Sequence, residues 1–412
     1  MKDKEIGKLI KEEEKRQKSV INLIASENYV SDDVLKALGS KLTNKYAEGY
    51  PGKRYYGGNE VIDKIENLCI KRALQAFKLS SKDPARPNVG HSGRWHVNVQ
   101  SLSGSPANLA VYLALVPLQG KIMGMSLAHG GHLTHGHFVS ASGKFWKQVP
   151  FEVDRETETL NYEKIKEQAV KEKPAIIVAG FTAYPRIIDF KKFREIADAC
   201  PNVDANGRAR GAILMVDMSH FAGLVAGGAY PSPFLYADVV TTTVHKTLRG
   251  PRSAMIFSKI DERDLGKKID KAVFPGLQGG PHMNQIAAVA VALKEATSPV
   301  FKKYAKQVVK NAKVLAEELK RLGWRIISGG TDSHLILVDV WMNGKGITGS
   351  EAGDKLEKAG IIVNKNAIPF DSRKPFDPSG IRLGTAGETT RGAKEKDIKK
   401  IARRIDKILR AK

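Results

Sequence analysis

"ADVVTTTVHKTLRGPR" (residues 237–252) joins a β-branched run to an adjacent histidine and lysine. β-branched residues fit a pleated surface, so residues 238–244 are predicted to form a strand. Gly250-Pro251 then predicts a turn. Lys246 therefore lies at or just past the end of a strand. It is either an ordinary surface lysine or a partly buried one whose amine loses its proton easily enough to form a Schiff base with a carbonyl.

The residues around this stretch alternate between short apolar runs and amphipathic segments. Apolar runs predict strands at 121–127, 145–153, 175–181, 211–218 and 238–244, and amphipathic segments predict helices at 162–172 and 190–200. Such alternation is typical of an α/β layer with a mostly parallel sheet. Two long helices are predicted next, at 280–296 and 301–323, with Gly323 in the position that commonly ends a helix.

The pattern changes after Gly323, where short strand and helix signals predict a small α+β domain. The predicted organisation is an N-terminal helix and arm at 1–35, a large cofactor-binding domain at 36–295, a connecting helix at 296–322 and a small C-terminal domain at 323–412. The last segment has Ile398, Ile401, Ile405 and Leu409 at helical spacing, which predicts an amphipathic terminal helix. The polar, turn-rich segment at 82–94 is predicted to be a surface loop.

Composition limits the classes of protein that the chain can represent. It has 412 residues, 42% of them hydrophobic, which is ample for a large core. Two cysteines without a CxxC pair suit a reducing cytoplasm, and we expect neither a signal peptide nor a membrane span. The net charge of +23, from 67 Lys and Arg against 44 Asp and Glu, favours anionic partners. Because the lysines are spread over the chain, nucleic-acid binding is expected to be incidental at most.

Polar residues near predicted strand ends suggest a ligand site, since parallel sheets bind ligands there. Asp217 closes an apolar run and is followed by His220. A carboxylate at such a place needs a partner, which is either a structural ion pair or a cationic heterocycle. In "SLSGSPAN" (101–108), Ser105 suits a helix cap and Pro106 the first turn, so free backbone N–H groups offer a phosphate site, although any capped helix looks similar.

Three further motifs carry chemistry. "LAHGGHLTHGHF" (127–138) has four histidines, but its glycine pair and the lack of nearby Cys, Asp or Glu argue against a zinc helix. A histidine lying flat on an aromatic cofactor is the more economical interpretation. The loop "NKYAEGYPGKRYYGGNE" (44–60) gathers tyrosines and charges, and is either a binding loop or a subunit contact. Arg382, within an apolar strand, needs an anion, and its planar fork suits a carboxylate.

Together these features describe one site. It combines a Schiff-base lysine, a carboxylate for a ring nitrogen, a phosphate cradle, a stacking histidine and a carboxylate-binding arginine. That combination predicts a pyridoxal-phosphate enzyme that acts on an amino acid, with no metal. Asp217 would keep the pyridine nitrogen protonated, so that the ring accepts electrons from the bond broken at Cα.

Eight segments in one order resemble the serine hydroxymethyltransferase family, and the resemblance covers nearly the whole chain. They are "INLIASEN", "NKYAEGYPGKRYYGG", "NVQ…SGS…AN", "LAHGGHLTHG", "VDMSHFAGL", "VVTTTVHKTLRGPR", "FPGLQGGP" and "SGIRLGT…TTRG". The resemblance implies an aspartate-aminotransferase-like fold, with a three-layer large α/β domain, a mixed, mostly parallel sheet and a smaller α+β C-terminal domain. It also implies a cytoplasmic homodimer or tetramer with active sites between subunits. The reaction would transfer the serine hydroxymethyl group to tetrahydrofolate or a related reduced pterin, giving glycine.

The resemblance assigns cofactor contacts to individual residues. Lys246 would form the Schiff base with pyridoxal phosphate, Asp217 would contact the ring nitrogen, and His132 would stack on the ring. His220 and Thr182 would lie near the phenolic oxygen, and His245 and Thr243 beside the lysine. The phosphate would be held by Ser103, Gly104 and Ser105. Three residues of the partner subunit would also contact the phosphate, namely Tyr46, Gly279 and Gly280.

It assigns substrate contacts as well. Arg382 would bind the amino-acid carboxylate, helped by Ser26 and by Tyr56 of the partner subunit. Glu48 would transfer the proton at the serine hydroxyl and the folate. The pterin pocket would be lined by Leu127, Tyr55 and Asn366, and Gly131 belongs to the same substrate-binding set.

The chain departs from the family pattern at several positions. Val244 stands where another threonine is usual, Ser101-Leu102 replaces Pro-His, and Thr182 replaces a serine but keeps its hydroxyl. Ala386-Gly387-Glu388 changes the wall expected beyond Arg382. Two alternatives are a threonine-aldolase-type lyase on the same fold, which would not need Glu48 and its tyrosine loop, and a basic RNA-binding protein with secondary or lost catalysis.

Overall fold

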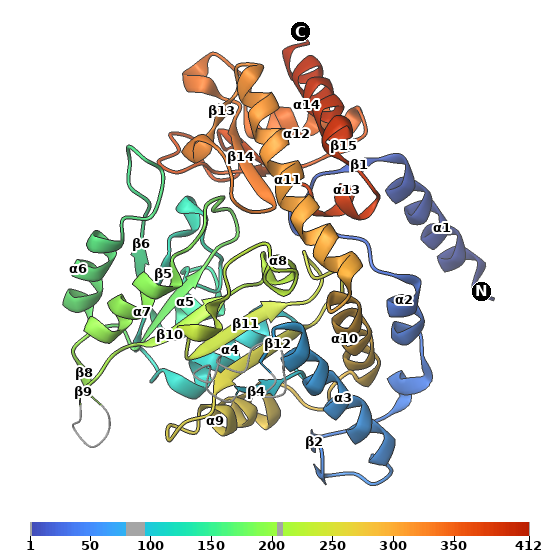
Figure 1. Cartoon of the computed structure of the whole chain (residues 1–412), viewed down its shortest axis with the longest axis vertical. Coiled ribbons are helices and arrows are strands. Elements are labelled where there is room, and N and C mark those ends of the chain that lie inside the picture. Colours follow the sequence, from blue (N-terminus) through green and yellow to red (C-terminus); the bar gives the residue numbers. More distant parts are fainter. Residues whose placement is uncertain (1, 80–94, 204–208, 412) are drawn as a thin grey trace.

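A seven-stranded sheet forms the centre of the larger part of the chain (Figure 1). The structure is a computed structural model that describes residues 2–79, 95–203 and 209–411, so the loop predicted at 82–94 lies outside the described residues. The strands lie in the order β4 (Trp95–Asn98), β12 (Ala254–Lys259), β11 (Val239–Thr243), β10 (Ile213–Asp217), β7 (Ile176–Gly180), β5 (Lys121–Met125) and β6 (Lys147–Phe151). β12 pairs antiparallel with β11 and β4, and the other neighbours pair parallel, which confirms the predicted mixed, mostly parallel sheet.

Alternate residues of the central strands pack on opposite faces of this sheet. On β10, Met215 joins a hydrophobic cluster with residues of α4 (Gly104–Leu115) and α9 (Leu265–Lys271), while Leu214 and Val216 join a larger cluster. The larger cluster includes residues of α3 (Glu60–Ala76), α6 (Tyr162–Glu172), α7 (Phe190–Ala199), α8 (Ala222–Ala226) and α10 (Met283–Ala296). The sheet is therefore the middle of three layers, as the family resemblance implied.

A second, smaller sheet lies beyond α11 (Pro299–Arg321). Its antiparallel strands have the order β13 (Arg325–Ile326), β14 (Leu335–Asp339), β17 (Gly380–Gly384) and β16 (Asn364–Asn366). It shares a core with α12 (Gly349–Lys358) and α14 (Glu395–Arg410), and Ile398, Ile401, Ile405 and Leu409 of α14 are buried as their spacing predicted. β1 (Ile21–Asn22) pairs with β15 (Ile361–Ile362), which ties the N-terminal arm to this part of the molecule.

Two long helices begin at other residues than the sequence predicted. α10 starts at Met283 instead of 280, and α11 starts at Pro299 instead of 301. The earlier start of α11 follows from its cap, because Ser298 Oγ accepts the Phe301 N–H and a proline suits the first turn. The remaining α-helices and strands are α1 (Lys4–Ser19), α2 (Asp32–Leu38), α5 (Ala141–Phe145), α13 (Ala386–Thr390), and the pairs β2 (Gly49–Tyr50) with β3 (Lys53–Arg54) and β8 (Asn202–Val203) with β9 (Ala209–Arg210).

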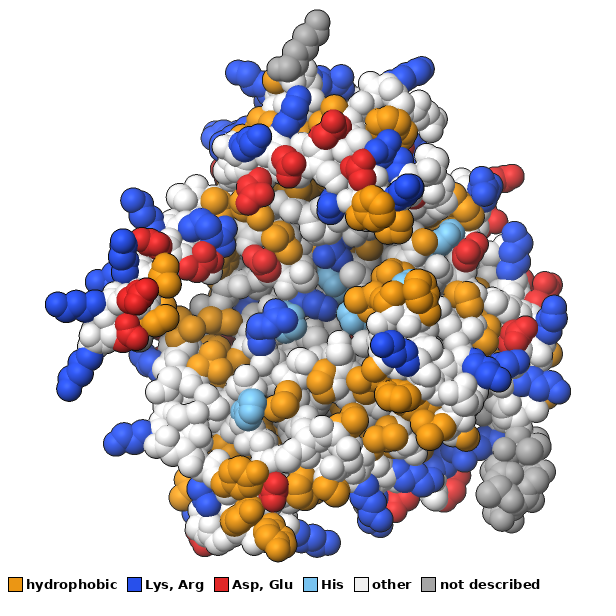
Figure 2. Space-filling view, turned by 180° about the vertical axis from the view of Figure 1, so that it is seen from behind, with side chains coloured by type: hydrophobic (Ala, Val, Ile, Leu, Met, Phe, Trp, Pro, Cys, Tyr) orange, Lys and Arg blue, Asp and Glu red, His pale blue; other side chains and the backbone are white. Residues whose placement is uncertain are grey.

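The surface carries charge in a dispersed form. On the face seen in Figure 2, Lys and Arg side chains are scattered, many of them near acidic groups, instead of gathering in one patch. α1 buries no residue, and its Ile6, Leu9 and Ile10 are exposed. None of the described helices is long and apolar enough to cross a membrane.

We expect Asp238→Ala to lower the free energy of unfolding by about 3–5 kcal/mol, because it breaks a buried ion-pair network. Asp238 precedes β11 and accepts hydrogen bonds from Arg194 at 2.7 Å, from Arg263 at 2.6 Å and from the Leu214 N–H at 2.9 Å. The substitution leaves two guanidinium groups without this carboxylate. Denaturant unfolding of the full chain measures the loss.

Asp198→Ala is the matched control. Asp198 pairs with the same Arg194 at 2.7 Å, but its side chain is 65% exposed. Exposed pairs contribute little, so we expect a loss of about 0.5 kcal/mol or less. Equal destabilisation by the two substitutions would contradict the assigned role of Asp238.

Candidate active site

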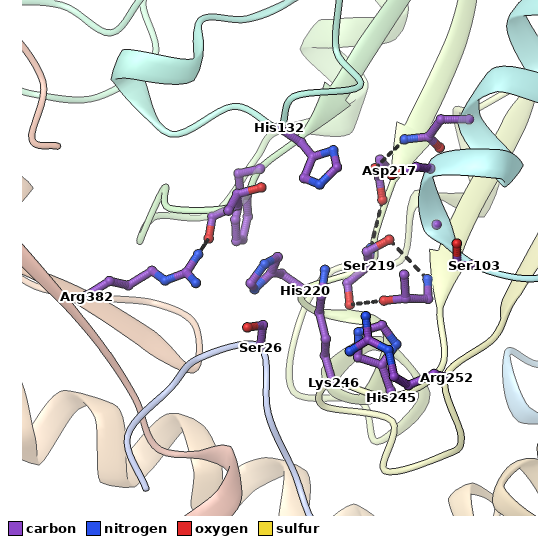
Figure 3. Close-up of a pocket in the computed structure, with 16 residues that line it drawn as sticks. Ser26, Ser103, His132, Asp217, Ser219, His220, His245, Lys246, Arg252 and Arg382 are labelled. Carbon is purple, nitrogen blue, oxygen red and sulfur yellow. Dashed lines mark hydrogen bonds between the residues drawn. The ribbon is translucent and has the colours of Figure 1, made fainter. Parts of the chain in front are cut away.

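A cavity of about 280 Å³ lies where the carboxyl ends of β7, β10 and β11 meet the N-terminus of α4 (Figure 3). Elements distant in sequence complete it, because Ser26 comes from the N-terminal arm and Arg382 from β17. Residues that the sequence predicted line it as follows: Ser26, Ser103, Gly104, Ser105, His132, Thr182, Asp217, His220, Thr243, His245, Lys246 and Arg382. Four lining residues were not predicted, namely Asn108, Phe181, Ser219 and Arg252.

The Lys246 side chain is buried, and its amine points into the cavity (Figure 3). Burial lowers the pKa of Lys246 to about 8; the charge of Asp217 opposes this shift, and the charges of Arg382 and Arg252 add to it. An amine with this pKa is partly neutral near physiological pH, and only the neutral form attacks a carbonyl. The structure therefore favours the reactive interpretation of this lysine over a surface lysine.

Hydrogen bonds hold the loop that carries Lys246. Thr247 Oγ1 donates to the His220 carbonyl at 2.9 Å and accepts the Gly223 N–H at 3.0 Å. Asn28 Nδ2 donates to the carbonyl of Lys246 at 2.9 Å. The N-terminal arm thus helps to position the lysine. The sequence around Lys246 gives no sign of this contact.

Asp217 ends β10 at the wall of the cavity, and three groups surround its carboxylate. Asn108 Nδ2 donates to it at 2.9 Å, the Ser219 N–H donates at 3.1 Å, and His135 Nε2 lies at 3.2 Å. Burial alone would raise the pKa of Asp217, but the hydrogen bond and charge of His135 outweigh it and hold the pKa well below its usual range. The carboxylate is therefore ionised, which suits a ring nitrogen that carries a proton.

Two histidines on the cavity wall are neutral at physiological pH. Burial, with the nearby charge of His135, lowers the pKa of His132 to about 4. The Thr134 N–H donates to His132 Nδ1 at 3.1 Å, so the ring orientation is fixed. Burial and the charge of Lys246 lower the pKa of His245 to about 3. Neutral imidazoles can lie against an aromatic ring without repelling the cationic groups nearby.

Arg382 is buried in β17 with polar but no acidic partners among the described residues. Nε donates to Asn364 Oδ1 at 3.1 Å, and Nη1 donates to the Thr182 carbonyl at 2.6 Å. Burial lowers the pKa of Arg382 to about 10, so it stays charged at neutral pH. A buried guanidinium whose N–H groups are not all hydrogen-bonded needs an anion as partner. A carboxylate suits it, because its two oxygens can accept two parallel hydrogen bonds from the guanidinium.

The departures from the family pattern leave this arrangement intact. Glu388 lies in α13, and its Oε1 accepts the Asn22 N–H at 2.9 Å, so it holds the N-terminal arm. Val244 is fully buried in the hydrophobic core and does not line the cavity. Thr182 lines the cavity, where its Oγ1 has no hydrogen-bond partner among the described residues.

The N-terminus of α4 offers the predicted phosphate cradle. Ser103 is its N-cap and makes no side-chain capping bond, which leaves first-turn N–H groups available. A Cβ on Gly104 would lie 2.6 Å from Thr243 Cγ2, so only glycine fits this close approach. Arg252 adds a positive charge to the same cavity.

These observations fit pyridoxal phosphate group by group. Lys246 would hold its aldehyde carbon, Asp217 its ring nitrogen, and the start of α4 its phosphate. The unpartnered hydroxyl of Thr182 offers a hydrogen bond to a ligand oxygen. Among the described residues, no group of three or more His, Cys, Asp or Glu side chains could hold a metal ion.

The predicted residues of the tyrosine loop lie outside this cavity and form a second cluster, defined here as Tyr46, Glu48, Tyr55, Tyr56, Gly279 and Gly280. Tyr46 donates to Glu48 Oε1 at 3.3 Å, and the ring of Tyr56 packs edge-on against Tyr46 and Tyr55. The three tyrosines are 55%, 82% and 45% exposed in chain order. A single chain therefore does not bring Glu48 to Lys246.

Three predicted substrate residues also lie off the cavity wall. Leu127 begins a short turn after β5, and Asn366 ends β16. Gly131 lies next to His132, and a Cβ there would approach Met125 O to 1.9 Å, so a close backbone contact requires glycine. Their roles stay predictions.

Only some of the residues that sequence reasoning missed carry a local signal. Asn108 is a polar residue in a largely apolar helix, and Arg252 directly follows the Gly250-Pro251 turn after Lys246, so both were detectable. Asn28, His135 and Phe181 act through contacts between distant segments, which no local pattern reports.

Comparison with known proteins supplies an independent finding. Residues 1–405 match the family model described as "Serine hydroxymethyltransferase". A protein of that name from Desulfotalea psychrophila (strain LSv54 / DSM 12343) is 54% identical over 407 residues, covering 99% of this chain and 88% of its own length. Another of the same name, from Koribacter versatilis (strain Ellin345), is 53% identical over 408 residues, covering 99% of this chain and 89% of its own length.

The lowered pKa of Lys246 predicts its labelling by a small acylating reagent. The neutral amine reacts, so the rate should rise with pH and reach half its maximum near pH 8, whereas an ordinary lysine reaches half its maximum only near about pH 10.4. Peptide mass spectrometry of the full chain, before cofactor is added, gives both profiles at once. Lys267, whose side chain is 80% exposed, is the control. Coincident profiles would show that the cavity does not alter Lys246.

Proposed function

The chain belongs to the serine hydroxymethyltransferase family, and we propose that the cavity around Lys246 is its active site. The protein catalyses the reversible transfer of the serine hydroxymethyl group to tetrahydrofolate, giving glycine and the methylene form of the carrier, and it depends on pyridoxal phosphate. It thereby joins serine–glycine interconversion to one-carbon metabolism. The family match supports neither the threonine-aldolase nor the RNA-binding alternative.

One observation carries the assignment of the site. A single cavity holds a buried amine of lowered pKa, an ionised carboxylate and a buried arginine without an acidic partner among the described residues. When bound, pyridoxal phosphate supplies an electron-withdrawing ring that stabilises negative charge at the amino acid's α-carbon. Lys246, Asp217 and His132 would hold its aldehyde carbon, ring nitrogen and ring face. Its other contacts would be Ser103, Gly104, Ser105, Thr182, His220, Thr243 and His245.

Arg382 and Ser26 are the proposed contacts of the amino-acid carboxylate. The guanidinium is already held by Asn364 and by the Thr182 carbonyl, so it needs little reorganisation to accept a bidentate anion. Binding at this point orients the bond between Cα and Cβ relative to the groups around Lys246. Ser26 reaches the cavity from the N-terminal arm, which Asn28 ties to the Lys246 loop.

Glu48 is the proposed proton-transfer group at the serine hydroxyl oxygen. A positioned acid or base of this kind contributes about 10²–10⁴-fold to a rate. Since Glu48 lies outside the cavity of its own chain, we propose a homodimer in which the second cluster faces the cavity of the other subunit. The exposed tyrosines support this arrangement, as does Figure 2, where hydrophobic side chains gather around a hollow that holds basic and histidine side chains. A tetramer built from such dimers is compatible with the same contacts.

The carrier would bind beside Leu127, Tyr55 and Asn366, with Gly131 adjacent. We propose a division into a large domain at 36–295 and a small domain at 323–412, which agrees with the two separate cores that α11 joins. We also propose a cytoplasmic location. Two buried free thiols, Cys69 and Cys200, suit a reducing compartment.

Lys246→Ala should abolish multiple turnover with serine and tetrahydrofolate, because it removes the amine that would bond the cofactor. Borohydride reduction of the loaded wild-type protein should attach the cofactor covalently to Lys246, and the variant should gain no such mass. Lys267→Ala, at an exposed position, is the control and should keep both properties. Sustained turnover by Lys246→Ala would contradict the site, and serine cleavage without any pterin would favour an aldolase.

Mixing two inactive proteins tests whether sites are shared between subunits. Glu48→Gln alters the second cluster, and Lys246→Ala alters the cavity. In the proposed dimer, a mixed pair therefore contains one site in which both Glu48 and Lys246 are intact. Random exchange of subunits should restore about a quarter of the wild-type sites, since half of the dimers are mixed and each has one intact site. The regained rate after denaturation and joint refolding is the measurement.

Each parent variant refolded alone provides the control for this mixture. If Glu48 acted within its own chain, every chain in the mixture would carry a lesion. No recovery at all, despite mixed dimers seen by native mass spectrometry, would therefore exclude the shared site.

A further inference from the structure

Glu48 lies in a tight turn between β2 and β3 whose backbone is closed by hydrogen bonds. The Tyr55 N–H donates to the Glu48 carbonyl at 3.0 Å, and the two strands pair across the turn. Gly49 has a φ of 92°, and a Cβ there would collide with the Lys53 carbonyl oxygen, so the turn requires glycine. Ala47, on the other side of Glu48, is fully buried in the larger hydrophobic core. The turn therefore sets the direction in which Glu48 leaves the backbone.

Arg54 holds the backbone on both sides of Glu48. Its Nη1 donates to the Ala47 carbonyl at 2.9 Å and to the Gly49 carbonyl at 2.7 Å. These two residues stand directly before and directly after Glu48 in the chain. The Arg54 side chain is only 4% exposed, so water competes little for these bonds. A single guanidinium nitrogen thus fixes the chain where Glu48 is attached.

The other two nitrogens of this guanidinium are anchored to α3. Nε donates to Asp63 Oδ1 at 2.8 Å, and Nη2 donates to Glu66 Oε2 at 2.5 Å. Gln100 adds a second link, because its Nε2 donates both to Glu66 Oε1 at 2.8 Å and to the Gly49 carbonyl at 3.0 Å. Hydrogen bonds between charged groups are stronger than neutral ones. The Glu48 turn is therefore tied firmly to a long helix that packs in the core.

We propose that Arg54 is a positioning residue that holds Glu48 in place for proton transfer at the serine hydroxyl oxygen. Arginine presents five N–H groups in a planar fork, and here four of them join two carbonyls to two carboxylates. Lysine has the same charge, but its single nitrogen cannot span these four acceptors. The proton-transfer role of Glu48 rests on the proposed function, whereas the hold of Arg54 on the turn is a property of the chain itself.

Steady-state kinetics of Arg54→Lys, Glu48→Gln and the double variant test this proposal on the full chain loaded with pyridoxal phosphate. A displacement of about 1 Å can cost on the order of 10²-fold in rate, so we expect Arg54→Lys to lower kcat by about that factor. The KM for serine should change little, because Arg382 is the proposed contact of its carboxylate. The double variant should be only as slow as Glu48→Gln, since Arg54 acts through Glu48.

Arg72→Lys is the matched control for these kinetics. Arg72 also lies in α3, but it donates to the Ala290 carbonyl at 2.8 Å and so joins α3 to α10 instead of to the Glu48 turn. This variant should keep the wild-type kcat even if the substitution lowers the free energy of unfolding. Losses that multiply in the Arg54→Lys, Glu48→Gln double variant would overturn the proposal, as would a wild-type kcat in Arg54→Lys.

Amide hydrogen exchange of the full chain without cofactor supplies a readout other than activity. The Tyr55 N–H donates to the Glu48 carbonyl and the Gly52 N–H to Asp63 Oδ2, so both amides should exchange slowly in the wild type. Arg54→Lys should accelerate exchange at both amides, and Arg72→Lys should not. A wild-type Tyr55 amide that exchanges as fast as in the unfolded chain would overturn the proposal, even if no Arg54 variant folds.

Subunit mixing shows which site the effect of Arg54 reaches. Arg54→Lys refolded with Lys246→Ala should regain about a quarter of the wild-type sites, because one site of each mixed dimer is intact. Arg54→Lys refolded with Glu48→Gln should regain nothing beyond its parents, since both changes alter the same turn. The opposite pattern would overturn the proposal by placing the effect in the cavity of Arg54's own chain. A wild-type kcat in Glu48→Gln would instead overturn the proposed function of Glu48, and hydrogen exchange would still decide whether Arg54 holds the turn.

Discussion

Burial of charge at the carboxyl ends of β7, β10 and β11 is the constraint on which the rest of the structure depends. A lysine, an aspartate and an arginine share one cavity, where little water can screen them. Burial and the neighbouring arginines lower the pKa of Lys246. Asp217 keeps its negative charge because His135 and Asn108 stabilise its carboxylate. Buried charges of this kind are tolerable only where hydrogen bonds surround them. The hydrogen-bond partners come from distant segments, namely Asn108 and His135 for Asp217, and Asn364 and Thr182 for Arg382.

The second cluster is tied to the cavity of its own chain through a buried polar network. Arg54 donates to Glu66 at 2.5 Å, and Gln100 donates to the same carboxylate at 2.8 Å. Gln278, which precedes the glycine pair of the second cluster, donates to the Gln100 carbonyl at 2.5 Å and accepts the Leu102 N–H at 3.3 Å. The segment that leads into the N-terminus of α4 is thus held by the same residues that hold the tyrosine loop. In the proposed dimer, each subunit would hold its own cofactor and its contribution to the other site as one rigid unit.

The smaller sheet also contributes to the cavity, through Arg382 and through the contact of His334 with His220. Its strands are therefore part of the site as well as of a separate core. Glu388 shows how a departure from the family pattern is accommodated, because it bonds the arm that carries Ser26 and leaves Arg382 undisturbed. Packing between the two sheets sets the distance from the Arg382 guanidinium to the Lys246 amine.

The sequence by itself determined the α/β class, the strands that end in Asp217 and shortly before Lys246, and the chemical types that line the cavity. Those follow from local causes, namely side-chain periodicity, β-branching and turn residues. Only the tertiary structure decided that Asn28 holds the lysine loop, that His334 meets His220, and that Glu48 lies apart from the cavity of its own chain. These contacts join residues 114 and 218 positions apart. Their geometry depends on how whole layers pack, which no short stretch of sequence encodes.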